Sequence, residues 1–184
     1  MTSTSSPAQS QSSLNWRSYI TLLLIAGTVV LLDQWTKTWV RDNLALSQTW
    51  MPWEQLAPYA RIVHWQNSGA AFGMFQNAGA FFAVLAVLVA GMIIYYFPRL
   101  EPGDWAVRLG MSLQLGGALG NLIDRLQHGH VTDFISIGNF PIWNIADAAI
   151  TCGVAVMILD MMFNPVHRKP AATAPAHGDD QASS

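Results

Sequence analysis

Charged residues are scarce in this 184-residue chain. Asp, Glu, Lys and Arg make up only 11% of it, whereas a soluble domain usually carries about 25%. Apolar residues make up 52%, so we predict a membrane protein. The formal net charge of −2 argues against a nucleic-acid partner. A single cysteine excludes an intramolecular disulfide, and because Cys152 lies in an apolar run we expect it to be packed.

The motifs of two common hydrolase classes are also missing. Ser68 has three histidines as candidate bases (His64, His128 and His130), but no G-x-S-x-G turn surrounds it, which argues against a serine nucleophile. The His128 and His130 pair resembles half of a metal site, yet the chain has no H-E-x-x-H and no cysteine partner for it. We therefore expect a polar turn there, and no metal or cofactor.

Long apolar runs dominate the rest of the chain. They cover Ser18–Leu32, which continues as a helix towards Val40, then Ala78–Phe97, Leu109–Ile123, and a run from Ile142 that is most apolar over Ala148–Leu159. A helix needs about 20 residues to cross the hydrocarbon core. We predict an α-helical membrane protein with four transmembrane helices over residues 18–163. Because no small-residue cleavage site follows the first run, we expect an uncleaved anchor and not a signal peptide.

Both ends of the chain have a different composition. Residues 1–17 are mostly Ser, Thr and Gln, and residues 164–184 are rich in Ala, Pro, Asp and Ser. We expect both to be disordered tails.

The polar residues within this framework fall on one side of the membrane if the four spans alternate in direction. The end of the first span, the start of the second, the end of the third and the start of the fourth share that side. It carries Asp33, Lys37, Asn67, Asn121, Asp124, Arg125, Asp133, Asn144 and Asp147. We therefore predict one polar site at one interface. The other side carries five of the nine Lys and Arg residues, which predicts cytoplasmic termini and an extracytoplasmic site.

Two segments connect the spans on the site side, over about residues 40–77 and 124–141. The first is too long for a plain loop. Trp50, Trp53 and Tyr59 in it favour the headgroup level, and Arg61–Trp65 has strand propensity. We expect a small sheet on the outer leaflet, followed by small residues from Gly69 onwards that allow close backbone approach.

Asp133 and Asp147 each border an apolar run. A carboxylate at a bilayer edge costs several kcal/mol unless it has a partner or a wet pocket, so it indicates function. Two of them at one depth suggest paired acid–base chemistry. The alternative is structural, as a helix cap or an ion pair with Arg125, and Asn67 and Asn144 are likewise either caps or site residues. A proton-coupled transporter or channel also uses intramembrane acids, but the opposite halves of the spans are almost free of charge.

Helical spacing links the remaining polar residues. Asn121, Asp124 and Arg125 follow one another at i, i+3 and i+4 and so share one helix face. We expect Asp124 to pair with Arg125 at the helix end, and Arg125 is also placed to reach a substrate carbonyl. Asp33 and Lys37 are spaced i, i+4, which predicts a salt bridge.

Five blocks of this sequence, in this order, resemble the bacterial lipoprotein signal peptidases (signal peptidase II) over residues 18–163. The blocks are Asp33-Gln34-Trp35-Thr36-Lys37, Asn67-Ser68-Gly69-Ala70-Ala71-Phe72-Gly73, Gly116–Arg125, Val131-Thr132-Asp133-Phe134 and Trp143-Asn144-Ile145-Ala146-Asp147. The resemblance implies a four-helix aspartyl endopeptidase of the bacterial inner membrane with a small extracytoplasmic β-cradle. It would remove the signal peptide from prolipoproteins, cutting just before a diacylglyceryl-modified cysteine.

The resemblance also implies roles for individual residues. Asp133 and Asp147 match the catalytic pair. Supporting or substrate-binding roles fall on Asn67, Gly69, Asn121, Asp124, Arg125, Asn144, Asp33 and Lys37. The expected partners are lipid-modified prolipoproteins and membrane lipid, and the expected state is a monomer. The family often has a longer segment between the two aspartates, so the shape of Ile135–Pro141 stays open.

Overall fold

The computed structural model describes residues 16–69, 75, 77–101 and 103–164, and most of it is helical. The helices are α1 (Trp16–Asn43), α2 (Gly79–Tyr96), α3 (Trp105–His128) and α4 (Ile145–Phe163). Short 3-10 turns lie at η1 (Glu54–Leu56) and η3 (Phe97–Arg99). The strands are β1 (Thr49–Trp50), β2 (Ala60–Asn67) and β3 (Val131–Ile137). The tails predicted at residues 1–17 and 164–184 lie almost entirely outside the described residues, although α1 begins at Trp16.

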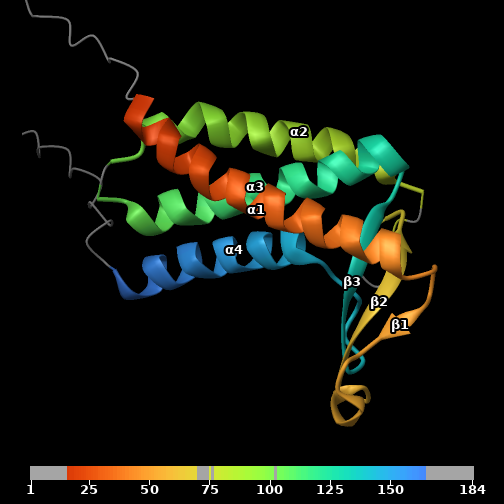
Figure 1. Cartoon of the computed structure of the whole chain (residues 1–184). Coiled ribbons are helices and arrows are strands. Elements are labelled where there is room, and N and C mark those ends of the chain that lie inside the picture. The colour runs from red at the N-terminus through yellow and green to blue at the C-terminus, as the bar shows by residue number, and fades with distance from the viewer. Residues whose placement is uncertain (1–15, 70–74, 76, 102, 165–184) are drawn as a thin grey trace, which may run out of the picture.

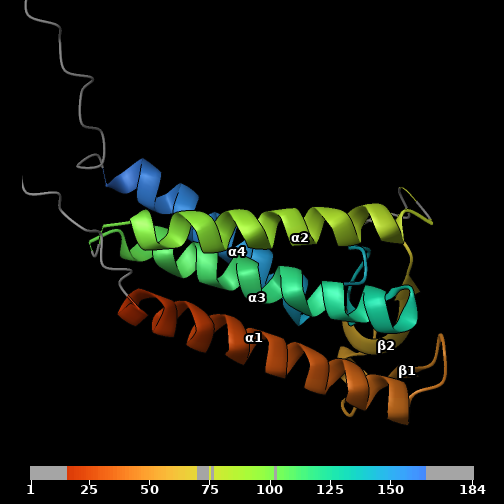
Figure 2. The same cartoon turned by 90° about the horizontal axis from the view of Figure 1, so that it is seen from above.

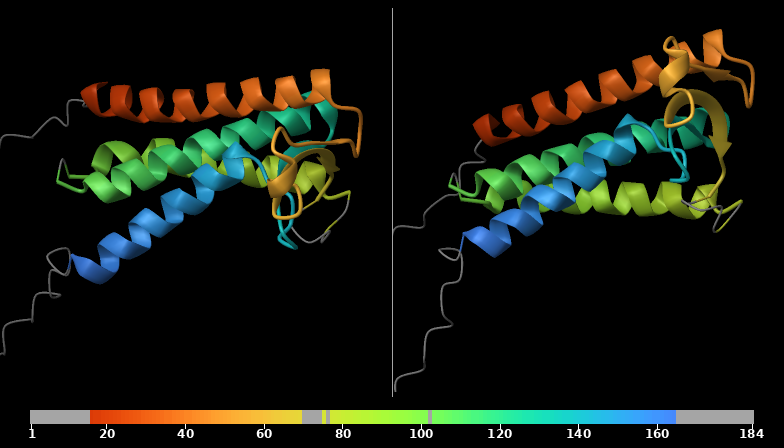
Figure 3. Two further views of the ribbon diagram at one scale, coloured as in Figure 1. Left: turned by 60° about the horizontal axis from the view of Figure 1, so that its bottom comes forward. Right: turned by 90° about the horizontal axis from the view of Figure 1, so that it is seen from below.

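The four helices form one bundle with the sheet at one end of it (Figure 1). Helix α3 lies in the middle and contacts α1, α2 and α4. Seen from above, α1, α3 and α2 run side by side (Figure 2). Helix α4 crosses the bundle obliquely, and its C-terminal end diverges from α1 (Figure 3). The start of α1, the α2–α3 connection and the end of α4 lie at the end opposite the sheet, as the alternation of four helices predicts.

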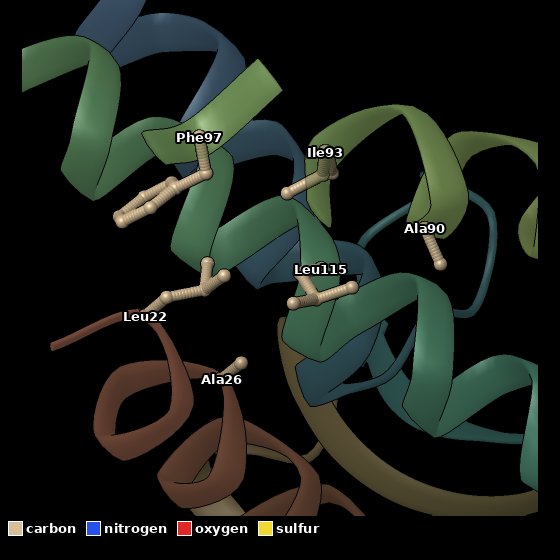
Figure 4. Close-up of a cluster of buried hydrophobic side chains, with 6 residues drawn as sticks. All are labelled: Leu22, Ala26, Ala90, Ile93, Phe97 and Leu115. Atoms are coloured by element: carbon tan, nitrogen blue, oxygen red, sulfur yellow. The ribbon is translucent and has the colours of Figure 1, made fainter. Parts of the chain in front are cut away.

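Small side chains on α3 allow its neighbours to approach closely. A Cβ added at Gly116 would lie 2.7 Å from Cβ of Val29 on α1, and one added at Gly117 would overlap the Ala146 carbonyl of α4. Around the same helix, α1, α2 and α3 bury an apolar cluster of Leu22, Ala26, Ala90, Ile93, Phe97 and Leu115 (Figure 4). The glycine-rich stretch of α3 is therefore a packing face.

The outer surface of the bundle is apolar, as lipid contact requires. Leu31, Val87 and Met92, for example, are all exposed. Within the part of the chain that the structure describes, three helices are long and apolar enough to cross a membrane, namely Tyr19–Asn43, Gly79–Arg99 and Ile145–Phe163. Cys152 belongs to this outer surface, so the expectation that it is packed is wrong. The reason is that an apolar run on a lipid-facing helix need not point into the protein.

The sheet is antiparallel in the order β1-β2-β3. Its middle strand confirms the strand predicted at Arg61–Trp65. Strand β3 was not predicted: the 124–141 connection consists of the last turn of α3, which runs to His128, and then this strand. Backbone hydrogen bonds between Ile135 and Trp143 fold the chain back beside β3 (2.8 and 3.1 Å). That return leads directly into α4.

A second apolar cluster joins the sheet to the bundle. Phe134 of β3 packs against Val40 and Leu44 at the end of α1. This cluster fixes the sheet to the end of α1 that carries the polar residues.

Candidate active site

The last turns of α1 carry a buried polar face. Asp33, Lys37 and Arg41 follow at i, i+4 and i+8, and the side chains of Asp33 and Lys37 are fully buried. Lys37 Nζ lies 2.8 Å from Asp33 Oδ2, which confirms the predicted salt bridge. A buried pair of this kind is retained only when further polar groups satisfy it, and those groups come from α3 and α4.

Asp124 on α3 meets this face and does not pair with its neighbour in sequence. Its Oδ2 lies 3.4 Å from Lys37 Nζ, and its Oδ1 lies 3.4 Å from Arg41 Nη1. The backbone N–H of Thr132 donates to Asp124 Oδ2 at 2.8 Å, which ties α3 to β3. The expected Asp124–Arg125 ion pair is therefore wrong, because consecutive helical residues point about 100° apart and α1 supplies nearer cations.

The register of the sheet brings Asn67 to Asp133. Trp65 pairs with Asp133 and Asn67 with Val131, so Asn67 and Asp133 are diagonal neighbours on one face. Asn67 Nδ2 donates to Asp133 Oδ2 at 2.9 Å, and Asp133 is only 1% exposed. The Asp133 carboxylate is thus almost completely shielded from solvent and is hydrogen-bonded to an amide.

The start of α4 positions Asp147. Asn144 is the N-cap: its Oδ1 accepts from the Asp147 N–H at 3.0 Å, and Asp147 Oδ2 accepts from the Asn144 N–H at 3.3 Å. This reciprocal arrangement is a capping box, so the helix start holds the half-buried Asp147 in place. At the same helix start, the backbone N–H of Ala146 donates to Asp33 Oδ1 of α1 at 2.9 Å.

Two asparagine amides connect the aspartates. Asn144 Nδ2 donates to Asp133 Oδ1 at 2.7 Å and to Asn121 Oδ1 at 3.2 Å. Asn121 Nδ2 in turn donates to Asp147 Oδ1 at 2.8 Å. Asn144 is therefore a helix cap, as one of the two alternatives predicted, and its side-chain amide also contacts Asp133 and Asn121. The four residues form one hydrogen-bonded cluster built from α3, β3 and α4.

The environment of Asp133 favours its protonated form. Burial, and next the negative charge of Asp147, raise the pKa of Asp133 to about 7, while hydrogen bonds from Asn67 and Asn144 and the charge of Lys37 oppose that rise. An exposed aspartate has a pKa near 3.9. Asp133 therefore titrates near neutral pH, where part of its population carries a proton.

Arg125 lies beside this cluster with unused hydrogen-bonding capacity. Its guanidinium reaches the carbonyl oxygens of Asn121 and Gly69 only at 3.5 Å each, the outer limit for such bonds. Its buried Nε has no partner among the described residues. Gly69 is also tied to the site from the other side, because its N–H donates to Asn67 Oδ1 at 3.0 Å. Residues 70–73, which include the small residues predicted after Gly69, lie outside the described residues.

The histidines do not form a serine-protease arrangement within the described part of the chain. His64 Nδ1 bonds the Leu44 carbonyl at 2.8 Å, and Ser68 Oγ accepts from the Asn77 N–H at 3.4 Å. His128 and His130 flank Gly129, whose φ of 77° closes the end of α3. They therefore form the polar turn that the sequence predicts.

Comparison with known proteins adds the family to this geometry. The sequence model of a family described as signal peptidase (SPase) II matches residues 25–163. The chain belongs to the signal peptidase II family. It is accordingly a peptidase, and the matched region contains the whole polar cluster.

Relatives of this signal peptidase II chain cover most of its length. The lipoprotein signal peptidase of Xanthomonas campestris pv. campestris (strain 8004) is 38% identical over 150 residues, which span 77% of this chain and 88% of the relative. That of Geobacillus thermodenitrificans (strain NG80-2) is 41% identical over 144 residues, spanning 76% and 88%. A solved structure described as a bacterial membrane enzyme, determined in meso at 2.3 Å resolution, is 30% identical with a TM-score of 0.73, covering 84% of this chain and 94% of that one.

Three residues of the signal peptidase II cluster were not predicted from sequence. Gln34 Nε2 donates to the Gly120 carbonyl at 3.0 Å, and Arg41 Nη1 donates to Thr132 Oγ1 at 3.1 Å. Arg41 lies on the face of Asp33 and Lys37, one turn further on, so its helical spacing could have revealed it. Gln34 and Thr132 give no comparable signal, because their partners lie on other elements.

Proposed function

We propose that this protein removes the signal peptide from diacylglyceryl-modified prolipoproteins, as an aspartyl endopeptidase that cuts just before the lipidated cysteine. The supporting observation is the cluster in which Asn121 and Asn144 join the two carboxylates. Membership of the signal peptidase II family favours this activity over the transporter or channel considered from the sequence. The relatives named lipoprotein signal peptidase support the substrate class.

In the proposed reaction the two aspartates have different roles. Asp147 is half-buried, and as the general base it takes a proton from a water molecule whose oxygen attacks the scissile carbonyl carbon. Asp133, protonated near neutral pH, donates to the carbonyl oxygen as the tetrahedral intermediate forms. When the C–N bond breaks, the proton held by Asp147 passes to the leaving amine. As the new carboxyl group forms, Asp133 regains its proton from a hydroxyl group of the intermediate, so one water molecule is consumed and both aspartates return to their starting states.

We further propose that Arg125 binds a carbonyl of the substrate backbone. Its weak contacts at 3.5 Å and its unpartnered Nε leave donors available for that purpose. The ring of Phe82, 5.4 Å from the guanidinium, supports the cation without competing for those donors.

The proposed placement puts all four helices across the inner membrane of a bacterium. Helix α3 has 24 residues and is therefore about 36 Å long, enough to cross a core of about 30 Å. It carries polar residues because the other helices, and not lipid, surround it. The sheet would lie at the outer headgroup level, where exposed Trp53 and Tyr59 are favoured. Both termini would be cytoplasmic and the protein a monomer.

Lipid also explains how a substrate could be held without a deep pocket. The acyl chains of the modified cysteine can remain in the bilayer, where each buried CH₂ contributes about 0.8 kcal/mol. The peptide beside that cysteine would then enter the polar cluster at the same depth.

The experiment compares one precursor in two forms. Purified protein is incubated with a diacylglyceryl-modified prolipoprotein and with the same precursor lacking the lipid, and the products are identified by mass spectrometry. We expect cleavage of the lipidated form alone, immediately before the modified cysteine. Equal cleavage of both forms, or of neither, would refute the proposed substrate.

A further inference from the structure

The ammonium of Lys37 is fully buried and uses its whole hydrogen-bonding capacity inside the protein. It lies 2.8 Å from Asp33 Oδ2, 3.4 Å from Asp124 Oδ2 and 2.9 Å from Asn121 Oδ1. A lysine ammonium has three donors and no acceptor. All three are directed at these oxygens, so Lys37 has no donor left for a substrate.

The contact with Lys37 fixes the direction of the Asn121 amide. Because the ammonium can only donate, the Asn121 oxygen faces it and the NH₂ group faces away, towards Asp147 Oδ1 at 2.8 Å. Rotating the amide by 180° would place two donors against each other at Lys37 and two acceptors against each other at Asp147. The cation thereby ensures that Asp147 meets an N–H donor and not an oxygen.

The same logic extends to the second aspartate. Asn121 Oδ1 also accepts from Asn144 Nδ2 at 3.2 Å, and Asn144 Oδ1 is occupied by the Asp147 N–H. The NH₂ group of Asn144 is therefore directed at Asp133 Oδ1, at 2.7 Å. The contact with Lys37 thus orients the Asn121 amide towards Asp147 and, through the contact between the two amides, helps to orient the Asn144 amide towards Asp133.

We propose that Lys37 is a positioning residue for the aspartate pair, acting through the amides of Asn121 and Asn144. The inference rests on the proposed function of that pair. Within the described residues Lys37 has no hydrogen bond to Asp133 or Asp147, so it orients the reacting groups without touching them. A positioning error near 1 Å can lower a rate on the order of 100-fold, which is the loss expected when this orientation is removed.

The variants must preserve the charge balance of the buried face, where Lys37 and Arg41 meet Asp33 and Asp124. Removing Lys37 alone would leave a buried carboxylate without its cation, which destabilises the fold. The test variant is therefore Lys37→Met/Asp33→Asn, in which the introduced amide still offers an oxygen to the Ala146 N–H. Asp33→Asn alone is measured for comparison, because it lacks the same carboxylate but keeps the ammonium on Asn121.

A double-mutant cycle with Asn121→Leu tests whether the cation acts through that amide. We expect the Lys37→Met/Asp33→Asn pair and Asn121→Leu each to lower kcat on the order of 100-fold with little change in KM. Combining them should cause no further loss, since coupled residues are not additive, and Asp33→Asn alone should lose less kcat than the Lys37→Met/Asp33→Asn pair. The proposal would be overturned if the losses of kcat multiplied in the combined variant. It would also be overturned if Asp33→Asn alone lost as much kcat as the Lys37→Met/Asp33→Asn pair.

A second measurement needs no substrate. The groups that act electrostatically on Asp133 are Asp147 of α4 and Lys37 of α1, and Arg125 of α3 interacts with both carboxylates. Because Lys37 lowers the pKa of Asp133, removing the cation should raise that pKa in a carboxyl ¹³C NMR titration. An unchanged titration would contradict the proposal.

Two further arms complete the design. If Lys37→Met/Asp33→Asn does not fold, as judged by circular dichroism in detergent, Lys37→Met/Asp124→Asn removes the same ammonium with a different carboxylate and carries the same expectations. If the unmodified protein does not cleave a lipidated precursor, the proposed function fails, while the titration still decides whether Lys37 controls the aspartate pair.

Discussion

At the scale of single residues, the two aspartates have the same side chain but lie in different environments. Asp133 is almost completely buried and is bonded by two amides, whereas Asp147 is half-buried at a helix start. Burial and the neighbouring charge raise the pKa of Asp133 to about 7. In the proposed mechanism Asp133 therefore carries the proton and Asp147 acts as the base.

The pH dependence of cleavage follows from that assignment. Below pH 7 Asp133 is mostly protonated and able to donate, and above pH 7 it ionises and loses that ability. We expect kcat/KM for a lipidated precursor to fall about tenfold per pH unit well above pH 7. The measurement is a pH–rate profile in detergent micelles. A rate that keeps rising to pH 9 would contradict the assigned protonation state.

At the scale of elements, the site depends on how closely α4 approaches α3. The Ala146 carbonyl, one residue before Asp147, occupies the space that a side chain at Gly117 would need. Gly120 stands in the same relation to Asp33, whose Oδ2 would lie 2.6 Å from an added Cβ. The glycines therefore position the start of α4 against the buried polar face of α1.

Gly117→Ala tests this packing. The added methyl group must push α4 away from α3, so we expect a loss of about 1–3 kcal/mol in stability together with reduced cleavage. Gly91→Ala is the matched control, because an added Cβ there meets nothing within 4 Å on the outer face of α2. Thermal unfolding in detergent and the cleavage assay are measured for both. A Gly117→Ala protein as stable and active as the control would show that the close approach is not needed.

The sequence predicted these elements unevenly, for physical reasons. The helices were predictable because lipid demands long apolar runs, and the alternation of spans placed the polar residues at one end. Strand β3 was missed because Val131–Ile137 is short, and because its strand character depends on pairing with β2. The partners of Asp124 were assigned wrongly because they lie on α1, far away in sequence. Packing of separate helices cannot be derived from spacing along one of them.

At the scale of the whole molecule, four distant segments meet at one end of a lipid-facing bundle. Helix α1 supplies the buried cations, α3 and the start of α4 supply the amides, and β3 and α4 supply the carboxylates. The sheet is anchored to α1 through Phe134, so the bundle and the sheet hold the two aspartates in one cluster. The rest of the surface can meet lipid without affecting this chemistry.

The most direct test of the account is cleavage of a lipidated precursor by Asp133→Asn and Asp147→Asn, with Asp42→Asn as the control, since Asp42 is an exposed residue near the same end of α1. Membrane insertion is verified by extraction and gel filtration for all three. The account predicts that both site variants insert normally and lose cleavage by at least about 1,000-fold, as paired catalytic groups do, while the control cleaves normally. Full cleavage by either site variant would contradict the aspartyl mechanism.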